Sequence, residues 1–201
     1  MTAGYRIGRL LGRDGVLYMP IVGPRGGICD RAEAARLAET PGQGHGGPRE
    51  FVGVAADESE PRFPGELRLD LTQLTPVVPI PLHLGDSELV VGTVERLALR
   101  SSAAIGGGTV GRVLLATARL DSSLLADIAW TAIMDEVIGG LCSVVTGPER
   151  AGRCQVEAIR ALRLGLVETS SLASAKILWI SENAPPPRAA PVPWDRDRDA
   201  L

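Results

Sequence analysis

The sequence predicts an α+β fold in which a small antiparallel β-barrel is flanked by helices. Three observations lead to this prediction. The apolar segments between residues 51 and 120 are short and separated by turn residues, which is typical of antiparallel strands. One longer segment, from Ser122 to Ile138, has its apolar residues at helical spacing. Several strands followed by one helix, rather than alternating with helices, disfavour a parallel α/β sheet.

The N-terminal part begins with two apolar runs, YRIGRLLG and VLYMPIVG, that are separated by an Arg-Asp-Gly turn. Because Gly accepts the positive φ angles of a tight turn, this pattern predicts a hairpin. Asp30 then predicts the N-cap of a short helix at 31–39. The Gly- and Pro-rich residues 40–50 predict a mobile loop.

The central strands are expected where apolar residues alternate or run together between turns. In the segment ELRLDL, alternation places Leu67, Leu69 and Leu71 on one face. The loop SSAAIGGG connects the last two of these strands. The expected strands span residues 51–56, 66–71, 77–84, 89–99 and 111–120.

The predicted helix at 122–138 begins at an N-cap supplied by Asp121 or Ser122 and ends before Gly139 at its C′ position. A strand is expected at GLCSVVTG, residues 140–147, and a last strand at AKILWI, residues 175–180. Residues 156–169 fit either a helix or a strand. The Pro-rich, charged residues 184–201 predict a disordered tail, so residues 1–183 form the expected single domain.

Composition narrows the functional classes. Apolar residues make up 45% of the chain but aromatic residues only 3%, which predicts an aliphatic core. A net charge of −3 disfavours a general nucleic-acid binder. The sequence contains no membrane-spanning apolar run and no leader-like N-terminal stretch, so we expect a cytoplasmic protein. Two histidines and three cysteines without CxxC spacing disfavour a zinc site, and we expect no metal or organic cofactor.

Four residues are candidates for nucleophilic catalysis. His83 lies at the end of an expected strand and is the base candidate, Cys142 and Ser143 are adjacent nucleophile candidates, and Glu168 is the candidate for orienting the base. A hydroxyl or thiol needs a base within hydrogen-bond reach, and the base needs a partner that fixes its tautomer. Neighbouring residues on a strand point to opposite faces, so only one of Cys142 and Ser143 can meet His83.

The order of these segments resembles the prohead proteases of tailed phages and the assemblins of herpesviruses. IPLHLGDSELVVGTV is similar to the family motif that carries the base, and GGLCSVV after the helix is similar to the GLS motif that bears the nucleophilic serine. RLGLVETSSLASAKI is similar to the last strand, where the position of the family's third polar residue falls near Arg163. The resemblance covers about residues 50–180.

The resemblance implies an assemblin-like fold and a serine-type endopeptidase that cleaves scaffold or capsid-protein segments during shell maturation. It implies His83 as base, Ser143 or Cys142 as nucleophile and Glu168 as orienting carboxylate. It also implies a homodimer that acts in the host cytoplasm, inside assembling shells if the protein is viral. From the charge and the hydropathy of the chain we expect no nucleic-acid or membrane partner. The alternative is a catalytically inactive protein of this fold that serves as a structural or scaffold-binding component.

Overall fold

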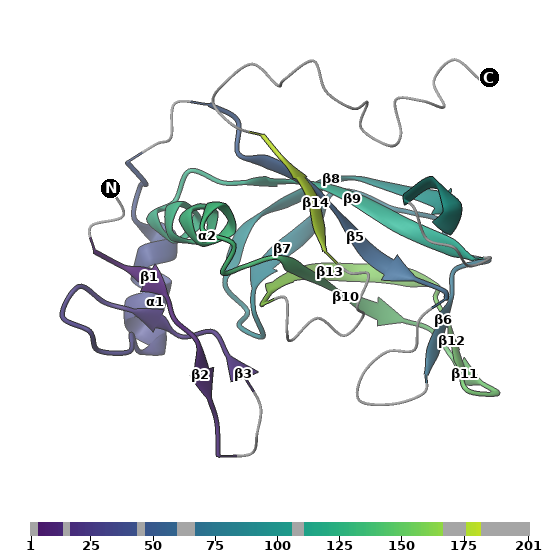
Figure 1. Cartoon of the computed structure of the whole chain (residues 1–201), viewed down its shortest axis with the longest axis horizontal. Coiled ribbons are helices and arrows are strands. Elements are labelled where there is room, and N and C mark those ends of the chain that lie inside the picture. Colours follow the sequence, from purple (N-terminus) through teal and green to yellow (C-terminus); the bar gives the residue numbers. More distant parts are fainter. Residues whose placement is uncertain are drawn as a thin grey trace.

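The computed structural model describes residues 4–13, 17–43, 47–59, 67–105, 111–166 and 176–181. These residues form a mostly β structure with two α-helices (Figure 1). The predicted α+β class is confirmed in this coarse form. The strands are β1 (Arg6–Ile7), β2 (Leu10–Leu11), β3 (Leu17–Tyr18), β4 (Ile21–Val22), β5 (Glu50–Asp57), β6 (Arg68–Asp70), β7 (Ile80–Leu84), β8 (Val90–Ser101), β9 (Arg112–Leu120), β10 (Gly140–Thr146), β11 (Glu149–Arg150), β12 (Arg153–Gln155), β13 (Ala158–Gly165) and β14 (Ile177–Ile180), and the helices are α1 (Arg31–Glu39), the 3-10 helix η1 (Ser102–Ile105) and α2 (Leu124–Met134).

The largest sheet has seven strands in the order β10-β13-β7-β8-β9-β5-β14 and curls into a half-barrel (Figure 1). The curl brings the two ends of this order together. An isolated antiparallel bridge joins Gly140 to Lys176, and the Ile177 amide donates to the Gly139 carbonyl at 2.9 Å.

The prediction of an antiparallel sheet is wrong at one pair of strands in this half-barrel, because β13 runs parallel to β7. The chain between them holds β8, β9, α2 and β10, and a connection of that length lets two strands of the same direction become neighbours. Residues 156–169, which fitted a helix or a strand, form β13 over 158–165.

The core on the inner side of the sheet is aliphatic, as the composition predicts, with Phe51 and Trp130 among its few aromatic residues. Gly53 on β5 permits a close approach of three strands there. A Cβ at this position would lie 2.5 Å from Leu141 Cδ1 and 2.9 Å from the Lys176 carbonyl oxygen. The two ends of the curled sheet therefore meet at a position without a side chain.

The helix α1 has the bounds and the cap that the sequence predicts. The Asp30 carboxylate accepts from the Glu33 amide at 2.7 Å. The helix α2 differs at both ends. Its N-cap is Ser123, whose Oγ accepts from the Ala126 amide at 3.1 Å, and the left-handed position after it is taken by Glu136, with φ 57°, instead of Gly139. The helix ends early because the amides of residues 137 and 138 both turn back to the Ala132 carbonyl.

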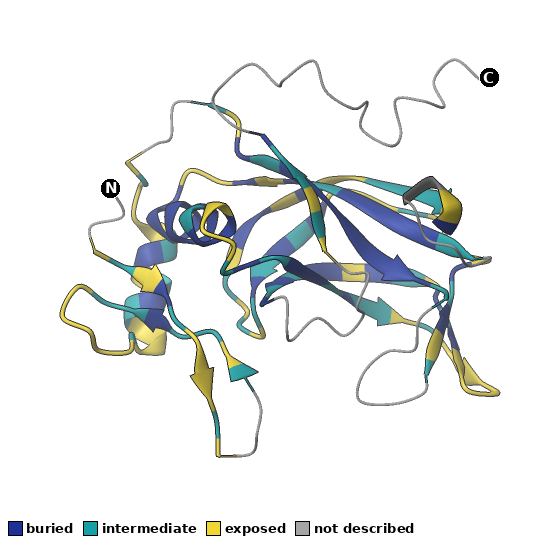
Figure 2. Cartoon of the chain, viewed as in Figure 1, coloured by how far each residue is buried: buried dark blue, intermediate teal, exposed yellow. Residues whose placement is uncertain are grey.

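The N-terminal hairpin is confirmed by two antiparallel pairs, β1 with β4 and β2 with β3. Ile7 and Ile21 are buried and anchor the first pair, which contacts α2. The second pair forms a narrow ribbon that projects away from both helices (Figure 1) and is largely exposed (Figure 2). Its leucines Leu10 and Leu11 are 46% and 67% exposed.

The segment predicted as a mobile loop at 40–50 is anchored at both of its described ends. The Gly42 amide donates to the Ser122 carbonyl at 2.7 Å, and the Gln43 amide donates to the Asp127 carboxylate at 2.7 Å. At the other end, Arg49 forms a buried ion pair with Asp127 at 2.5 Å. Residues 44–46 in the middle of this segment lie outside the described residues.

Among the described helices, neither is both long and apolar enough to cross a membrane. The tail expected at 184–201 lies outside the described residues.

Candidate functional site

The candidate site is one row of three residues across neighbouring strands of the half-barrel. Cys142 on β10 is the register partner of Arg163 on β13, and Arg163 is the register partner of His83 on β7. Residues opposite one another in a sheet point to the same face. All three are partly exposed, so this row lies on the outer face of the sheet.

The next row along the same strands points inward. It consists of Ser143, Leu162 and Leu82, which are 2%, 0% and 0% exposed. The Ser143 Oγ donates to the Ala55 carbonyl oxygen on β5 at 2.8 Å. The pair of Ser143 and His83 expected from the sequence is therefore not formed, because the pleat places the two side chains on opposite faces.

The His83 imidazole is oriented by a backbone group. Its Nδ1 lies 3.2 Å from the Ser87 carbonyl oxygen in the turn between β7 and β8. A carbonyl oxygen can only accept, so Nδ1 carries the proton in this contact and Nε2 of the neutral ring carries the lone pair. This is the tautomer that a general base needs.

The turn beside His83 is itself fixed. The Gly85 amide donates to the Leu164 carbonyl of β13 at 2.9 Å, and Gly85 adopts a φ of 58° that favours glycine. The Ser87 hydroxyl donates to the Leu84 carbonyl. These contacts hold the Ser87 carbonyl in place under the imidazole.

Arg163 occupies the middle of the row and is held by an acidic neighbour. Its Nη1 lies 2.8 Å from Asp86 Oδ1. Asp86 belongs to the same turn as Ser87, so the guanidinium is directed toward the His83 end of the row. Neighbouring strands are about 4.8 Å apart, which separates the Cα atoms of Cys142 and His83 by roughly 10 Å. The two side chains are therefore not direct neighbours, because Arg163 lies between them.

The remaining sequence candidates lie outside the described residues. Glu168, expected to orient the base, is one of these, and His45 is another. Within the described residues the orienting group is the Ser87 carbonyl, which sequence reasoning missed because a backbone acceptor leaves no signature in the sequence. Arg163 did have a signal, since it stands near the position of the family's third polar residue.

The other two thiols have different surroundings. Cys154 is buried and only 6% exposed. Cys29 is partly exposed, and burial, followed by a hydrogen bond with Glu33, raises its pKa to about 11. A thiol with such a pKa is almost entirely protonated at neutral pH, and it is the thiolate that reacts.

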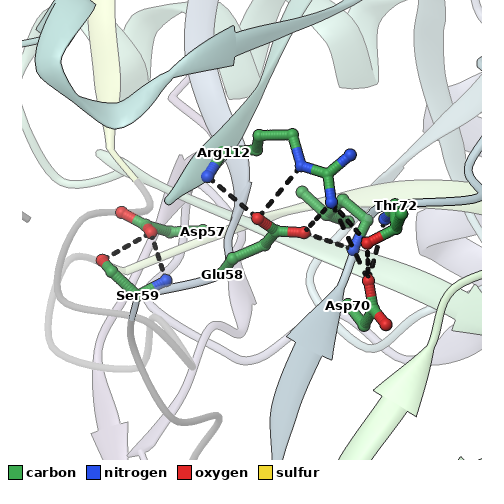
Figure 3. Close-up of polar contacts among 7 residues, drawn as sticks. Asp57, Glu58, Ser59, Asp70, Thr72 and Arg112 are labelled. Atoms are coloured by element: carbon green, nitrogen blue, oxygen red, sulfur yellow. Dashed lines mark hydrogen bonds and ion pairs between the residues drawn. The ribbon is translucent and has the colours of Figure 1, made fainter. Parts of the chain in front are cut away.

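A second polar cluster lies at the far end of β5, and Figure 3 shows it. The Glu58 carboxylate accepts from the Leu71 amide at 2.6 Å, from the Arg112 amide at 3.0 Å and from the Arg112 guanidinium at 3.0 and 3.2 Å. The Arg112 guanidinium also donates to the Thr72 hydroxyl at 2.5 Å. The acceptor positions of Glu58 are thus used to join the end of β5, the end of β6 and the start of β9, which is a structural role.

Asp70 in this cluster accepts from the Thr72 amide at 2.9 Å and from the Thr72 hydroxyl. These hydrogen bonds lower the pKa of the Asp70 carboxyl. Across the described ranges, no three His, Cys, Asp or Glu side chains gather as metal ligands would.

Comparisons with known proteins found no protein similar to this chain. No family model matches the chain, and no match was found among curated proteins or among solved structures.

Proposed function

We propose that this protein is a capsid-assembly endopeptidase of assemblin-like fold that uses Cys142, and not Ser143, as its nucleophile. The observation that carries the proposal is the outer row of the sheet, in which the Cys142 thiol and the His83 imidazole share one face. The contact of His83 Nδ1 with the Ser87 carbonyl supports the role of Nε2 as base.

In this mechanism the Cys142 proton passes to His83 Nε2 through the water between the two side chains, and the thiolate sulfur attacks the carbonyl carbon of the scissile peptide bond. The C–N bond then breaks, and the leaving amine takes the proton back from His83. Water hydrolyses the thioester and restores the thiol. Arg163, which lies between Cys142 and His83 in the row, is the cation proposed to attract the negative oxygen of the tetrahedral intermediate. The chemistry requires no cofactor.

The proposed substrates are scaffold or capsid-protein segments, and the proposed setting is the cytoplasm of a host cell. Both rest on the resemblance of the segment order, as does the proposed homodimer. Nucleic acid and membrane are not among the proposed partners.

A second candidate is an inactive protein of this fold that binds scaffold. It is favoured by one observation, the hydrogen bond from Ser143 Oγ to the Ala55 carbonyl. This bond gives a structural role to Ser143, which is the residue next to the family's nucleophile position. Arg163 between Cys142 and His83 is also compatible with this candidate.

Alkylation of the full chain with iodoacetamide, followed by peptide mass spectrometry, separates the two. We expect His83→Gln to slow the alkylation of Cys142 on the order of tenfold, because Gln can still donate to the Ser87 carbonyl but cannot accept a proton from the thiol. Cys29 in the same sample is the internal control, and its rate should not change. A fluorophosphonate should leave Ser143 unlabelled.

Cleavage of a mixed peptide library by the same proteins completes the test. We expect cleavage by the native chain and by Ser143→Ala, and its loss in Cys142→Ala. If Cys142 is alkylated equally fast in the native chain and in His83→Gln, and no library peptide is cleaved, the proposal of an enzyme is overturned. The inactive, scaffold-binding protein would then be the remaining candidate.

A further inference from the structure

The ribbon formed by β2 and β3 is a feature that the proposed function does not use. Leu10 is the register partner of Tyr18, and Leu11 is the register partner of Leu17. Since opposite residues share a face, one face of the ribbon carries Leu10 and Tyr18, and the other carries Leu11 and Leu17. Leu10, Leu11 and Tyr18 are 46%, 67% and 45% exposed. The ribbon therefore shows apolar side chains to solvent on both of its faces.

An isolated two-stranded ribbon is only marginally stable in water. This one projects from the body of the molecule (Figure 1), and its apolar residues are not among the described residues of the core or those packed against it. Exposed apolar residues that are grouped in this way are typical of an interaction surface.

Charge indicates what covers the ribbon. The first 29 residues contain four arginines, at positions 6, 9, 13 and 25, and one acidic residue, Asp14, which gives a net charge of +3. The whole chain has a net charge of −3, so the remaining residues carry −6. Arg9 and Arg13 flank β2 and are exposed. An acidic partner is attracted to this end of the molecule and repelled by the rest, which also sets the direction of approach.

We propose that the β2–β3 ribbon docks an acidic segment of another protein, with leucine or valine side chains at alternate positions that pack on the ribbon. A nucleic acid would use the arginines but would leave the leucines uncovered. The proposal does not depend on the activity of the Cys142 row.

The test is fluorescence anisotropy of a labelled synthetic peptide of four Asp-Leu-Glu-Val repeats, titrated with the full chain. We expect saturable binding that weakens as salt is raised. The paired changes Leu10→Ser with Leu11→Ser, and Arg9→Ser with Arg13→Ser, should each weaken binding on the order of tenfold. Two matched controls remove an exposed apolar or an exposed arginine side chain elsewhere. They are Val77→Ser and Arg150→Ser, and both should bind as the native chain does.

Further measurements test whether the ribbon binds nucleic acid, a membrane or a second copy of the chain instead of an acidic peptide. No saturable peptide binding, or equal loss in the controls, would overturn the proposal. So would ribbon-dependent binding of oligothymidine or of phosphatidylserine vesicles with no binding of the peptide. Sedimentation of the protein alone addresses a second copy, because a dimer abolished by Leu10→Ser with Leu11→Ser would assign the ribbon to self-association instead.

Discussion

At the scale of single residues, the adjacent residues Cys142 and Ser143 on β10 face opposite sides of the sheet. Cys142 faces outward in the row with Arg163 and His83, while Ser143 faces inward and donates to the Ala55 carbonyl of β5. Because β10 and β5 lie at different places in the strand order, this hydrogen bond ties two distant strands of the curled sheet together.

Replacing Ser143 by Ala should therefore lower the free energy of unfolding by about 1–2 kcal/mol, because a buried carbonyl loses its partner. The alkylation rate of Cys142 should not change. Urea unfolding followed by circular dichroism measures the first effect, with Thr146→Ala at the exposed end of the same strand as control. An unchanged unfolding midpoint would show that the Ser143 hydroxyl adds no stability.

Cys29 provides a prediction about pH. Its pKa of about 11 means that the reactive thiolate becomes abundant only as the pH rises toward that value. Alkylation of Cys29 should be slow at pH 8 and should accelerate about tenfold for each pH unit up to pH 10. Glu33→Gln removes a negative charge that contributes to the raised pKa, so it should speed the reaction at pH 9. Rates measured by mass spectrometry that level off below pH 9 would contradict this prediction.

At the scale of elements, the buried ion pair of Arg49 and Asp127 joins the start of β5 to the first turn of α2. The two side chains are 6% and 3% exposed. Asp127 also accepts from the Gln43 amide, so the same carboxylate holds both described ends of the 40–50 segment.

Breaking this pair from one side should cost more than removing both charges. Arg49→Leu leaves a buried carboxylate without its cation and should destabilise the fold by about 3–5 kcal/mol. The double change of Arg49→Leu and Asp127→Leu should recover part of that loss. Thermal unfolding of the two variants checks the order, and a double variant less stable than the single one would be inconsistent with a charge effect.

At the scale of the whole molecule, the half-barrel depends on how closely its ends meet at Gly53. A Cβ there would lie 2.9 Å from the backbone of Lys176, which precedes β14. Gly53→Ala should therefore loosen β14 from β5 and cost about 1–3 kcal/mol. Hydrogen exchange of the β14 amides should become faster. Gly111→Ala is the control, since its nearest neighbours would be 3.6 Å away.

The sequence predicted the local elements of this molecule better than its long-range contacts. The α1 cap at Asp30, the hairpin before it and the strands β5 to β10 follow from turn residues and periodicity, which are local properties. The parallel pairing of β13 with β7 was not predictable in this way, because it depends on the order in which distant strands meet.

The same limit applies to the candidate site. Strand parity alone indicated that only one of Cys142 and Ser143 could face His83. Which of the two does so depends on the register across β13, and that register is a long-range property. The Ser87 carbonyl and the ion pair of Arg163 with Asp86 arise from the conformation of a turn, which residue types do not specify.

The parallel pair of β7 and β13 also has a consequence for how the chain is made. β7 ends at Leu84, but its neighbour β13 begins only at Ala158, so a growing chain carries β7 with one uncovered edge during much of its synthesis. Because closing so long a loop costs more entropy than closing a hairpin, we expect β7 to pair with β8 before it pairs with β13. We therefore expect the thiol of Cys142 and the imidazole of His83 to come into one row late in folding. A chain that stops before β13 contains both residues but lacks the strand that aligns them.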